Sequence, residues 1–215
     1  MSKEVIKPKN EDLTELNAQL KNRSPQEIVE WAIDVANQPV VTTNFRPYEA
    51  SILHAVVAVK PDIHVIWCDT GYNTPQTYKC ADKIIQQLNL NIDLYVPKQS
   101  TAWRDVHMGI PSVDDEAHGE FTRQVKLEPF ERAMAEHQPD VWFTNLRKGQ
   151  TALRDNLDIL SFGRGGVLKV SPFYHWSDEE LDNYMAEHNL PNEFKYYDPT
   201  KALENRECGL HLPAE

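Results

Sequence analysis

The chain has 215 residues, a length that suits one ordinary domain. Hydrophobic residues make up 40% and charged residues 26%, the usual balance of a water-soluble globular protein. The net charge is −11, so we expect no binding to nucleic acid. No apolar run nears the roughly 18 residues of a membrane span, so we expect no binding to a membrane. Residues 1–5 lack a signal peptide's apolar core, so we expect a cytoplasmic protein.

The first half of the chain alternates helix and strand signals. Residues 1–23 are polar and predict a peripheral helix or arm. A capping box at Ser24, with Pro25 at the first helical position, opens a helix that runs to about Asn37. Hydrophobic patterning then predicts strands at residues 39–45, 63–68 and 92–96, and helices at 48–59 and 74–88.

The second half continues the alternation after a polar stretch at residues 97–125. It predicts helices at 128–137 and 177–188 and strands at 141–145 and 167–170, and residues 191–215 form a tail with little periodicity. Strands separated by helices of this length favour an α/β fold with an open, doubly wound parallel sheet, here as one domain over 1–215. Ligands of such folds bind at the carboxyl ends of the strands.

Polar residues gather where two of these strands end. Thr42, Thr43, Asn44 and Arg46 follow the first strand, and they suit either a helix cap or a phosphate-binding turn. Asp69 and Gly71 follow the second strand and suit either a plain β-to-α turn or a contact with a nucleoside. No Walker lysine and no GxGxxG accompanies them, so the common nucleotide fingerprints are absent.

A third polar cluster begins after the strand that ends at Asn145. Residues 141–177 hold two acidic and five basic side chains, in a chain that is acidic overall. A solvated charged face is one interpretation, but guanidinium groups at a strand end also suit phosphate or sulfate, and we favour an anion site. The basic residues are Arg147, Lys148, Arg154, Arg164 and Lys169.

The three cysteines are too few and too widely spaced for a disulfide framework, and no CxxC is present for a structural zinc or an iron–sulfur cluster. Cys68 and Cys80 fall in a predicted strand and helix, where packing is the simpler role. Cys208 has Arg206 before it and His211 after it, and cationic neighbours lower the pKa of a thiol. Cys208 is therefore either an incidental thiol or a nucleophile on a tail.

These motifs, taken in order, resemble one enzyme family. The ending Glu-Cys-Gly-Leu-His at 207–211 is similar to the signature of the phosphoadenylyl-sulfate (PAPS) reductases of assimilatory sulfate reduction. Asp-Thr-Gly-Tyr at 69–72, Lys-Leu-Glu-Pro at 126–129, Leu-Arg-Lys at 146–148 and Lys-Val-Ser-Pro at 169–172 also occur in that family's order. The resemblance spans residues 40–211.

The resemblance implies an adenine-nucleotide α-hydrolase-like fold, commonly dimeric. It implies that Cys208 attacks the sulfur of PAPS, that adenosine 3′,5′-bisphosphate leaves, and that reduced thioredoxin or glutaredoxin then releases sulfite. By position, Thr42, Thr43 and Asn44 would line the nucleotide loop and Asp69 and Gly71 would lie near the adenosine. Phosphate or sulfate would contact Arg147, Lys148, Gln150, Arg154 and Lys169, with Arg206 and His211 beside the thiolate.

Two features bear on the substrate. The cluster-bearing adenylyl-sulfate (APS) reductases carry a Cys-Cys pair and a CxxC, which this chain lacks, so the resemblance favours PAPS and no iron–sulfur cluster. The first loop reads Asn44-Phe45-Arg46, where the family commonly has Ser-Phe-Gly. The alternatives are the same reaction on APS without a cluster, or a nucleotide-binding paralogue without turnover. A ligase of the ATP-pyrophosphatase type is disfavoured because its Ser-Gly-Gly-x-Asp-Ser loop is missing.

Overall fold

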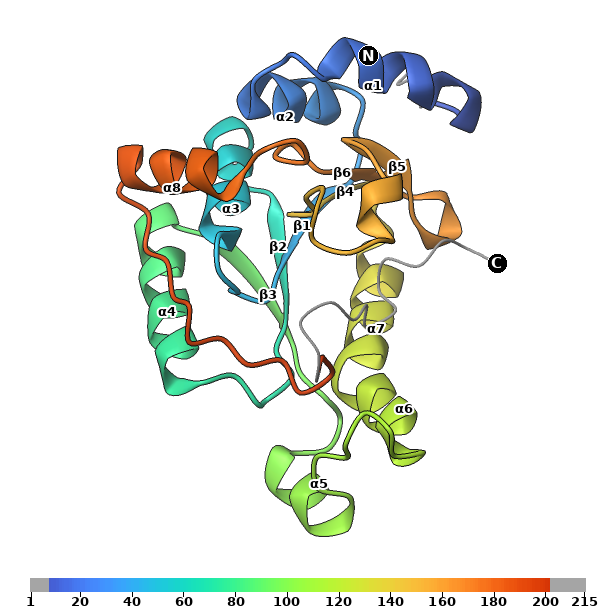
Figure 1. Ribbon diagram of the computed structural model, residues 1–215, viewed down its shortest axis with the longest axis vertical. Helices are drawn as coiled ribbons and strands as arrows, with labels where there is room; N and C mark the ends of the chain where they lie inside the picture. Colours follow the sequence, from blue (N-terminus) through green and yellow to red (C-terminus); the bar gives the residue numbers. More distant parts are fainter. Residues whose placement is uncertain (1–7, 202–215) are drawn as a thin grey trace.

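The computed structural model describes residues 8–201, which build a six-stranded sheet of order β3-β2-β1-β4-β6-β5 (Figure 1). All neighbouring strands are parallel except β5, which runs antiparallel to β6 at one edge. The expected doubly wound, mostly parallel α/β sheet is thereby confirmed. The strands are β1 (Pro39–Thr43), β2 (His64–Cys68), β3 (Asn91–Tyr95), β4 (Val141–Phe143), β5 (Leu160–Phe162) and β6 (Leu168–Val170).

Helices cover both faces of this sheet. One face is covered by α2, α3, α4 and α8, and the other by α7 (Figure 1). Among the described residues, no helix combines the length and the apolar character needed to cross a bilayer. The helices are η1 (Asn10–Asp12), α1 (Leu13–Leu20), α2 (Pro25–Asp34), α3 (Glu49–Val59), α4 (Pro75–Leu88), α5 (Thr101–His107), α6 (Ala117–Thr122), η2 (Arg123–Leu127), α7 (Glu128–His137), η3 (Arg154–Asn156), η4 (Arg164–Gly166) and α8 (Asp178–Glu187).

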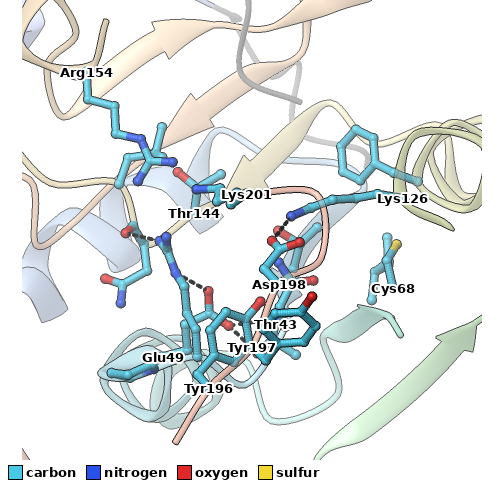
Figure 2. A pocket seen from close by; sticks show the side chains of 18 of the residues that line it. Thr43, Glu49, Cys68, Lys126, Thr144, Arg154, Tyr196, Tyr197, Asp198 and Lys201 are labelled. Atoms are coloured by element: carbon cyan, nitrogen blue, oxygen red, sulfur yellow. Dashed lines mark hydrogen bonds and ion pairs between the residues drawn. The ribbon is translucent and has the colours of Figure 1, made fainter. Parts of the chain in front are cut away.

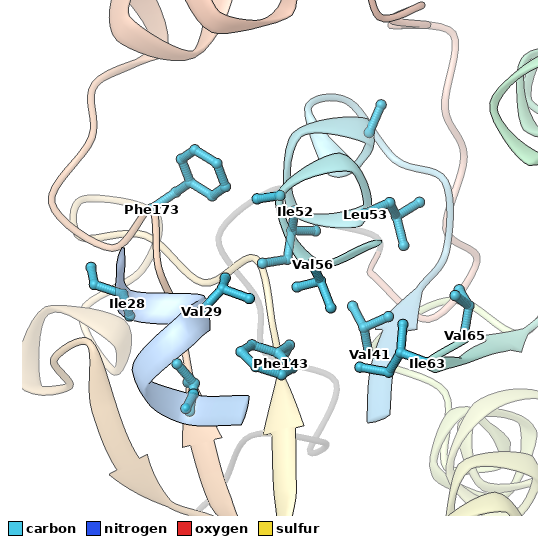
Figure 3. Close-up of a cluster of buried hydrophobic side chains, with 14 of the residues drawn as sticks. Ile28, Val29, Val41, Ile52, Leu53, Val56, Ile63, Val65, Phe143 and Phe173 are labelled. Atoms are coloured by element: carbon cyan, nitrogen blue, oxygen red, sulfur yellow. The ribbon is translucent and has the colours of Figure 1, made fainter. Parts of the chain in front are cut away.

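The core divides according to the alternation of side chains along the strands. Val41 of β1 points into the larger cluster, where it packs with side chains of α2 and α3 (Figure 3). Its neighbour Val40 points to the opposite face, where Trp142 of β4 and Ala133 of α7 cover it. Since β1 is buried on both faces, its end is held firmly between the two helical layers.

The capping box predicted at Ser24 is confirmed. The Ser24 hydroxyl accepts from the backbone N–H of Glu27 at 3.3 Å, and the Glu27 carboxylate accepts from the backbone N–H of Ser24 at 2.8 Å. Ser177 and Glu180 repeat this reciprocal arrangement at the start of α8. The central helices and strands also begin and end within about three residues of the bounds that the hydrophobic pattern predicts.

Two parts of the chain differ from the prediction. The polar stretch at 97–125 contains α5, α6 and the first turn of η2, whose apolar residues are too few to reveal helices by periodicity. The sequence does not predict the edge strand β5 either, because three residues are too short for a pattern. The N-terminal arm contains α1, which a buried side chain ties to this strand: Asn17 accepts from the backbone N–H of Leu160 at 2.8 Å and donates to its carbonyl at 3.0 Å.

Candidate functional site: a polar cavity where the strand order reverses

A cavity of about 490 Å³ opens at the carboxyl ends of β1, β2 and β4 (Figure 2). Strands β2 and β3 extend the sheet on one side of β1, and the later strands, beginning with β4, extend it on the other side. Doubly wound folds bind their ligands at this switch point. Its lining is Thr42, Thr43, Asn44, Arg46, Pro47, Glu49, Ile66, Cys68, Lys126, Phe130, Trp142, Thr144, Asn145, Leu146, Arg154, Phe194, Tyr196, Tyr197, Asp198 and Lys201.

Glu49, the first residue of α3, organises the loop that follows β1. It is 6% exposed, and its carboxylate accepts from the Thr43 hydroxyl at 2.8 Å, from the Asn44 backbone N–H at 2.7 Å and from Arg46 Nε at 2.8 Å. Phe45, between these partners, has a φ of 51°. The carboxylate therefore fixes a tight turn whose polar groups border the cavity.

A buried ion pair forms the opposite wall. Lys126 of η2 donates to Asp198 in a short contact (Figure 2). The Thr200 hydroxyl donates to the other Asp198 oxygen at 2.6 Å. Burial raises the pKa of Asp198, but the Lys126 ammonium and the Thr200 hydrogen bonds outweigh it and lower the pKa below its usual value. The pair joins the long helical segment of α6, η2 and α7 to the last described part of the chain.

η2 is a wider, π-helical turn between α6 and α7. Such turns inside longer helices often occur at functional sites. In this molecule Lys126 is 2% exposed and lies within the wall of the cavity. The Lys-Leu-Glu-Pro motif at 126–129 is the sequence signal for this residue, although the sequence does not indicate the role of its ammonium group.

Residues 194–201 cross the mouth of the cavity. Phe194 packs edge-to-face on Tyr48 with 5.8 Å between ring centroids, and the Lys195 carbonyl accepts from Thr74 at 2.6 Å. Tyr196 is half-buried, and burial of its hydroxyl raises the pKa of the phenol and keeps it protonated at neutral pH. This segment has no periodicity in the sequence, which therefore does not predict that Tyr196, Tyr197, Asp198 and Lys201 line the cavity.

The floor of the cavity is apolar. Trp142 and Phe130 pack with 5.0 Å between their ring centroids, and the Trp142 indole N–H donates to the Thr42 hydroxyl at 2.9 Å. Cys68 also borders the cavity, and burial raises the pKa of its thiol to about 12. The Cys68 sulfur is therefore a neutral thiol at physiological pH and a poor nucleophile.

Five of the expected site residues line this cavity: Thr42, Thr43, Asn44, Arg46 and Arg154. Arg154 is 2% exposed, and its Nη1 donates to Gln150 Oε1 at 2.5 Å. The same Gln150 oxygen accepts from the Arg147 backbone N–H at 3.1 Å. Gln150 therefore positions the Arg154 guanidinium and does not itself line the cavity.

Asp69 and Gly71 lie outside the cavity and build the turn after β2. Asp69 accepts from the Gly71 backbone N–H, from Asn73 and from the Tyr78 hydroxyl, all at 2.9–3.0 Å. Gly71 has a φ of 79°, and a Cβ on it would lie 2.5 Å from the Thr101 hydroxyl oxygen. These contacts show what the two residues contribute to the turn, and their contact with a nucleoside stays a prediction.

The other expected cations of the described chain do not line the cavity. Arg147 donates to Asp178 at the start of α8 at 2.6 Å and lies over the Tyr48 ring. Lys148 is exposed, whereas Lys169 is 1% exposed within β6 and lies outside the lining of the cavity. Arg164 borders a second, mainly apolar cavity of about 250 Å³ on the far side of Phe130 and Trp142. Cys208, Arg206 and His211 lie outside the described residues.

The wall also contains residues that the sequence does not single out. Thr144 and Asn145 lie at the end of β4, just as Thr42 and Asn44 lie at the end of β1. They could have been predicted, because folds of this kind bind ligands where the parallel strands end. The sequence indicates only that Glu49 is an acidic residue in the first turn of a helix.

In all, four cationic side chains and two carboxylates line the cavity, which makes it a positive site in a protein of net charge −11.

The chain is similar to known proteins over most of its length. The family model of the phosphoadenosine phosphosulfate reductase domain matches residues 38–197. A phosphoadenosine 5′-phosphosulfate reductase of Aliivibrio salmonicida is 36% identical, covering 93% of this chain and 88% of that protein, and one of Xylella fastidiosa is 35% identical, covering 86% and 78%.

Solved structures extend the comparison to the fold. A phosphoadenylyl-sulfate reductase of Candida auris, in a phosphate complex, superposes with a TM-score of 0.76 at 26% identity, covering 87% of this chain and 90% of that one. An NH3-dependent NAD synthetase of Campylobacter jejuni, at a TM-score of 0.55 and 11% identity, shares the fold alone. The chain belongs to the phosphoadenosine phosphosulfate reductase family.

Proposed function

We propose that this protein reduces 3′-phosphoadenylyl sulfate to sulfite and adenosine 3′,5′-bisphosphate, with Cys208 as the nucleophile and reduced thioredoxin as the electron donor. The observation that carries the proposal is the positive cavity at the switch point of the sheet. Guanidinium and ammonium groups in a partly enclosed site suit a ligand with several phosphate or sulfate groups. The relatives described above are reductases of this phosphosulfate by name, and the Candida auris enzyme forms a complex with phosphate.

The two kinds of wall suit the two parts of such a nucleotide. The apolar floor of Trp142 and Phe130 offers contact area to a purine ring. Arg46 and Arg154, with the polar turn at the end of β1, offer donors to phosphate oxygens. We propose that the nucleoside contacts the floor and that the two arginines hold the charged groups.

The proposed reaction has two stages. The Cys208 thiolate attacks the sulfonate sulfur, the S–O bond to the phosphate breaks, and adenosine 3′,5′-bisphosphate leaves with the electron pair. A thioredoxin thiolate then attacks the Cys208 sulfur, sulfite leaves with the electron pair, and the second thioredoxin thiol resolves the mixed disulfide. The dithiol supplies both electrons and becomes a disulfide, so the proposed cycle needs no resident cofactor.

Chain geometry supports Cys208 as the nucleophile. Lys201, the last described residue, borders the cavity, and Cys208 follows it by seven positions. An extended chain spans at most about 3.6 Å per residue, so the Cys208 sulfur is tethered within about 25 Å of the cavity rim. Cys68 borders the cavity, but the raised pKa of its thiol makes it unreactive.

The test is the intact mass of the pre-reduced full chain after mixing with PAPS or, separately, with APS, without thioredoxin. We expect PAPS to add one sulfonate group, which reduced thioredoxin removes. The adduct is absent from Cys208→Ser and retained in Cys68→Ser, a matched control whose sulfur borders the same cavity.

Three other outcomes would change the proposed substrate, the proposed activity or the proposed nucleophile. An adduct with APS that does not require the 3′-phosphate would replace PAPS by APS as the substrate. Tight binding of adenosine 3′,5′-bisphosphate without any adduct would make the protein a nucleotide-binding module without turnover. An adduct that persists in Cys208→Ser would refute the assignment of the nucleophile.

A further inference from the structure

A second group of potential ligands lies outside the lining of the cavity, near the start of β2 and the end of α7. His64 is the first residue of β2, Asp93 lies in the middle of β3, and His137 is the last residue of α7. Asp93 Oδ2 lies 2.6 Å from His64 Nδ1 and 3.5 Å from His137 Nε2, and the two imidazole rings are 4.9 Å apart. Three separate elements thus bring two imidazoles to one carboxylate oxygen.

The spacing of these groups suits a tetrahedral metal ion. Ligand atoms about 2.1 Å from such an ion lie about 3.4 Å from one another. The three donor atoms of His64, Asp93 and His137 all lie within 4.8 Å of one another, so small side-chain rotations bring them to that distance. Two imidazoles and a carboxylate are a ligand set that Zn²⁺ takes up, with water as a fourth ligand.

Other histidine contacts in the described chain lack one part of this set. His175 lies 3.0 Å from Asp158 but has no second imidazole beside it, and His54 packs on His188 without a carboxylate. Within residues 8–201, His64, Asp93 and His137 are the one group of three that meets the distance requirement. His137 is also held in place, since only 14% of its side chain is exposed.

We propose that His64, Asp93 and His137 bind a divalent late-transition ion, Zn²⁺ in the first place, independently of the proposed reaction. The ion would join the C-terminal end of α7 to β2 and β3. The other end of the same helical segment carries Lys126 and Phe130 in the wall of the cavity. The site would therefore stabilise the packing of α7 on the sheet, from the end opposite to the cavity.

The experiment uses the full chain without a histidine tag, in a Cys208→Ser background so that this thiol cannot bind metal. Co²⁺ titration followed by visible absorption and calorimetry measures the stoichiometry, and thermal unfolding with excess Zn²⁺ or with a chelator measures the stabilisation. The variants are His64→Gln, whose side chain is 53% exposed, and Asp93→Asn. The matched control is His175→Gln, which removes a histidine from a pair with a single carboxylate.

We expect one Co²⁺ per chain and a rise of roughly 5 °C in melting temperature with Zn²⁺. His64→Gln and Asp93→Asn should bind at least tenfold more weakly and lose the rise, whereas His175→Gln should behave as the background. Circular dichroism in chelator checks that each variant is folded. Binding that is unchanged in both site variants, or no saturable binding in the background, would overturn the proposal.

Discussion

Arg46 donates from Nη2 to the backbone carbonyl of Asn145 at 3.0 Å, across 99 positions of the chain. Its Nε also donates to Glu49 at 2.8 Å, so one guanidinium joins the turn after β1 to the end of β4. The family commonly has glycine at this position, yet the left-handed conformation belongs to Phe45 and not to Arg46. The arginine therefore replaces the glycine without backbone strain and braces the mouth of the cavity.

We expect Arg46→Ala to weaken the binding of adenosine 3′,5′-bisphosphate by about ten- to a hundredfold, the usual contribution of hydrogen bonds to a charged group. The substitution removes a cation from the cavity and leaves the buried Glu49 without its ion-pair partner. Calorimetry measures the effect. Arg164→Ala, which removes an arginine beside the second cavity, is the control, and equal affinity in the two variants would contradict the prediction.

The Lys126–Asp198 pair predicts a pH-dependent stability. Asp198→Asn should lower the free energy of unfolding by about 3 kcal/mol at pH 7, because it leaves a buried ammonium without its counter-charge. The pKa of Asp198 is lower in the folded chain than its unfolded value of about 3.9. Its contribution is thus complete above that value and is lost as the pH falls through the folded pKa.

Urea unfolding from about pH 7 to pH 3 checks this sign. The difference between the parent chain and Asp198→Asn should stay constant at neutral pH and shrink in acid. A difference that grew as the pH fell would show that the carboxylate is not stabilised as an anion. Glu187→Gln, on an exposed position of α8, controls for the general loss of one negative charge.

Gly71 and Gly109 allow the cost of a strained backbone conformation to be separated from the cost of a side-chain clash. Both glycines have positive φ, 79° and 67°, but a Cβ meets Thr101 at residue 71 and no neighbour within 4 Å at residue 109. Gly109→Ala should cost about 1 kcal/mol of stability from the backbone conformation alone. Gly71→Ala should cost at least about twice as much, because the Thr101 clash adds to it. Equal costs in urea unfolding would show that Thr101 moves aside without penalty.

The hydrogen bonds of Asn17 to Leu160 predict that detaching α1 from the edge of the sheet lowers the free energy of unfolding. Asn17→Ala leaves the backbone N–H and carbonyl of Leu160 without their partner and should cost about 2 kcal/mol in urea unfolding. Gln19→Ala, on the exposed side of the same helix, should cost under about 0.5 kcal/mol. Similar costs for the two substitutions would mean that α1 contributes by general packing only.

The sheet could be predicted because its strands and helices bury regular hydrophobic patterns, as Val40 and Val41 do on the two faces of β1. The turn from Thr42 to Arg46 could be placed at the site for a related reason, since parallel strands end at one edge. The position of this turn follows from the order of the strands and helices along the chain. Predicting it requires no knowledge of a long-range contact.

The remaining site residues depend on contacts that no local pattern reveals. Charge counting identifies Arg147 as a cation near a strand end, but Asp178 of a distant helix takes its guanidinium. Asp198 lies in a segment without periodicity, and its pairing with Lys126 over 72 positions fixes where that segment runs. Such pairings are tertiary, so they become visible only when the chain has folded.

The same pairing has a consequence for the order in which the protein is made. The cavity takes its walls from residues near 45, 126, 145 and 198, so no fragment from the first three-quarters of the chain holds all of them. A nascent chain can form β1, β2 and β3 with their helices while residues 194–201 are still in the ribosome. The ligand site is therefore completed last, and a nucleotide would stabilise the finished protein without guiding its earlier steps.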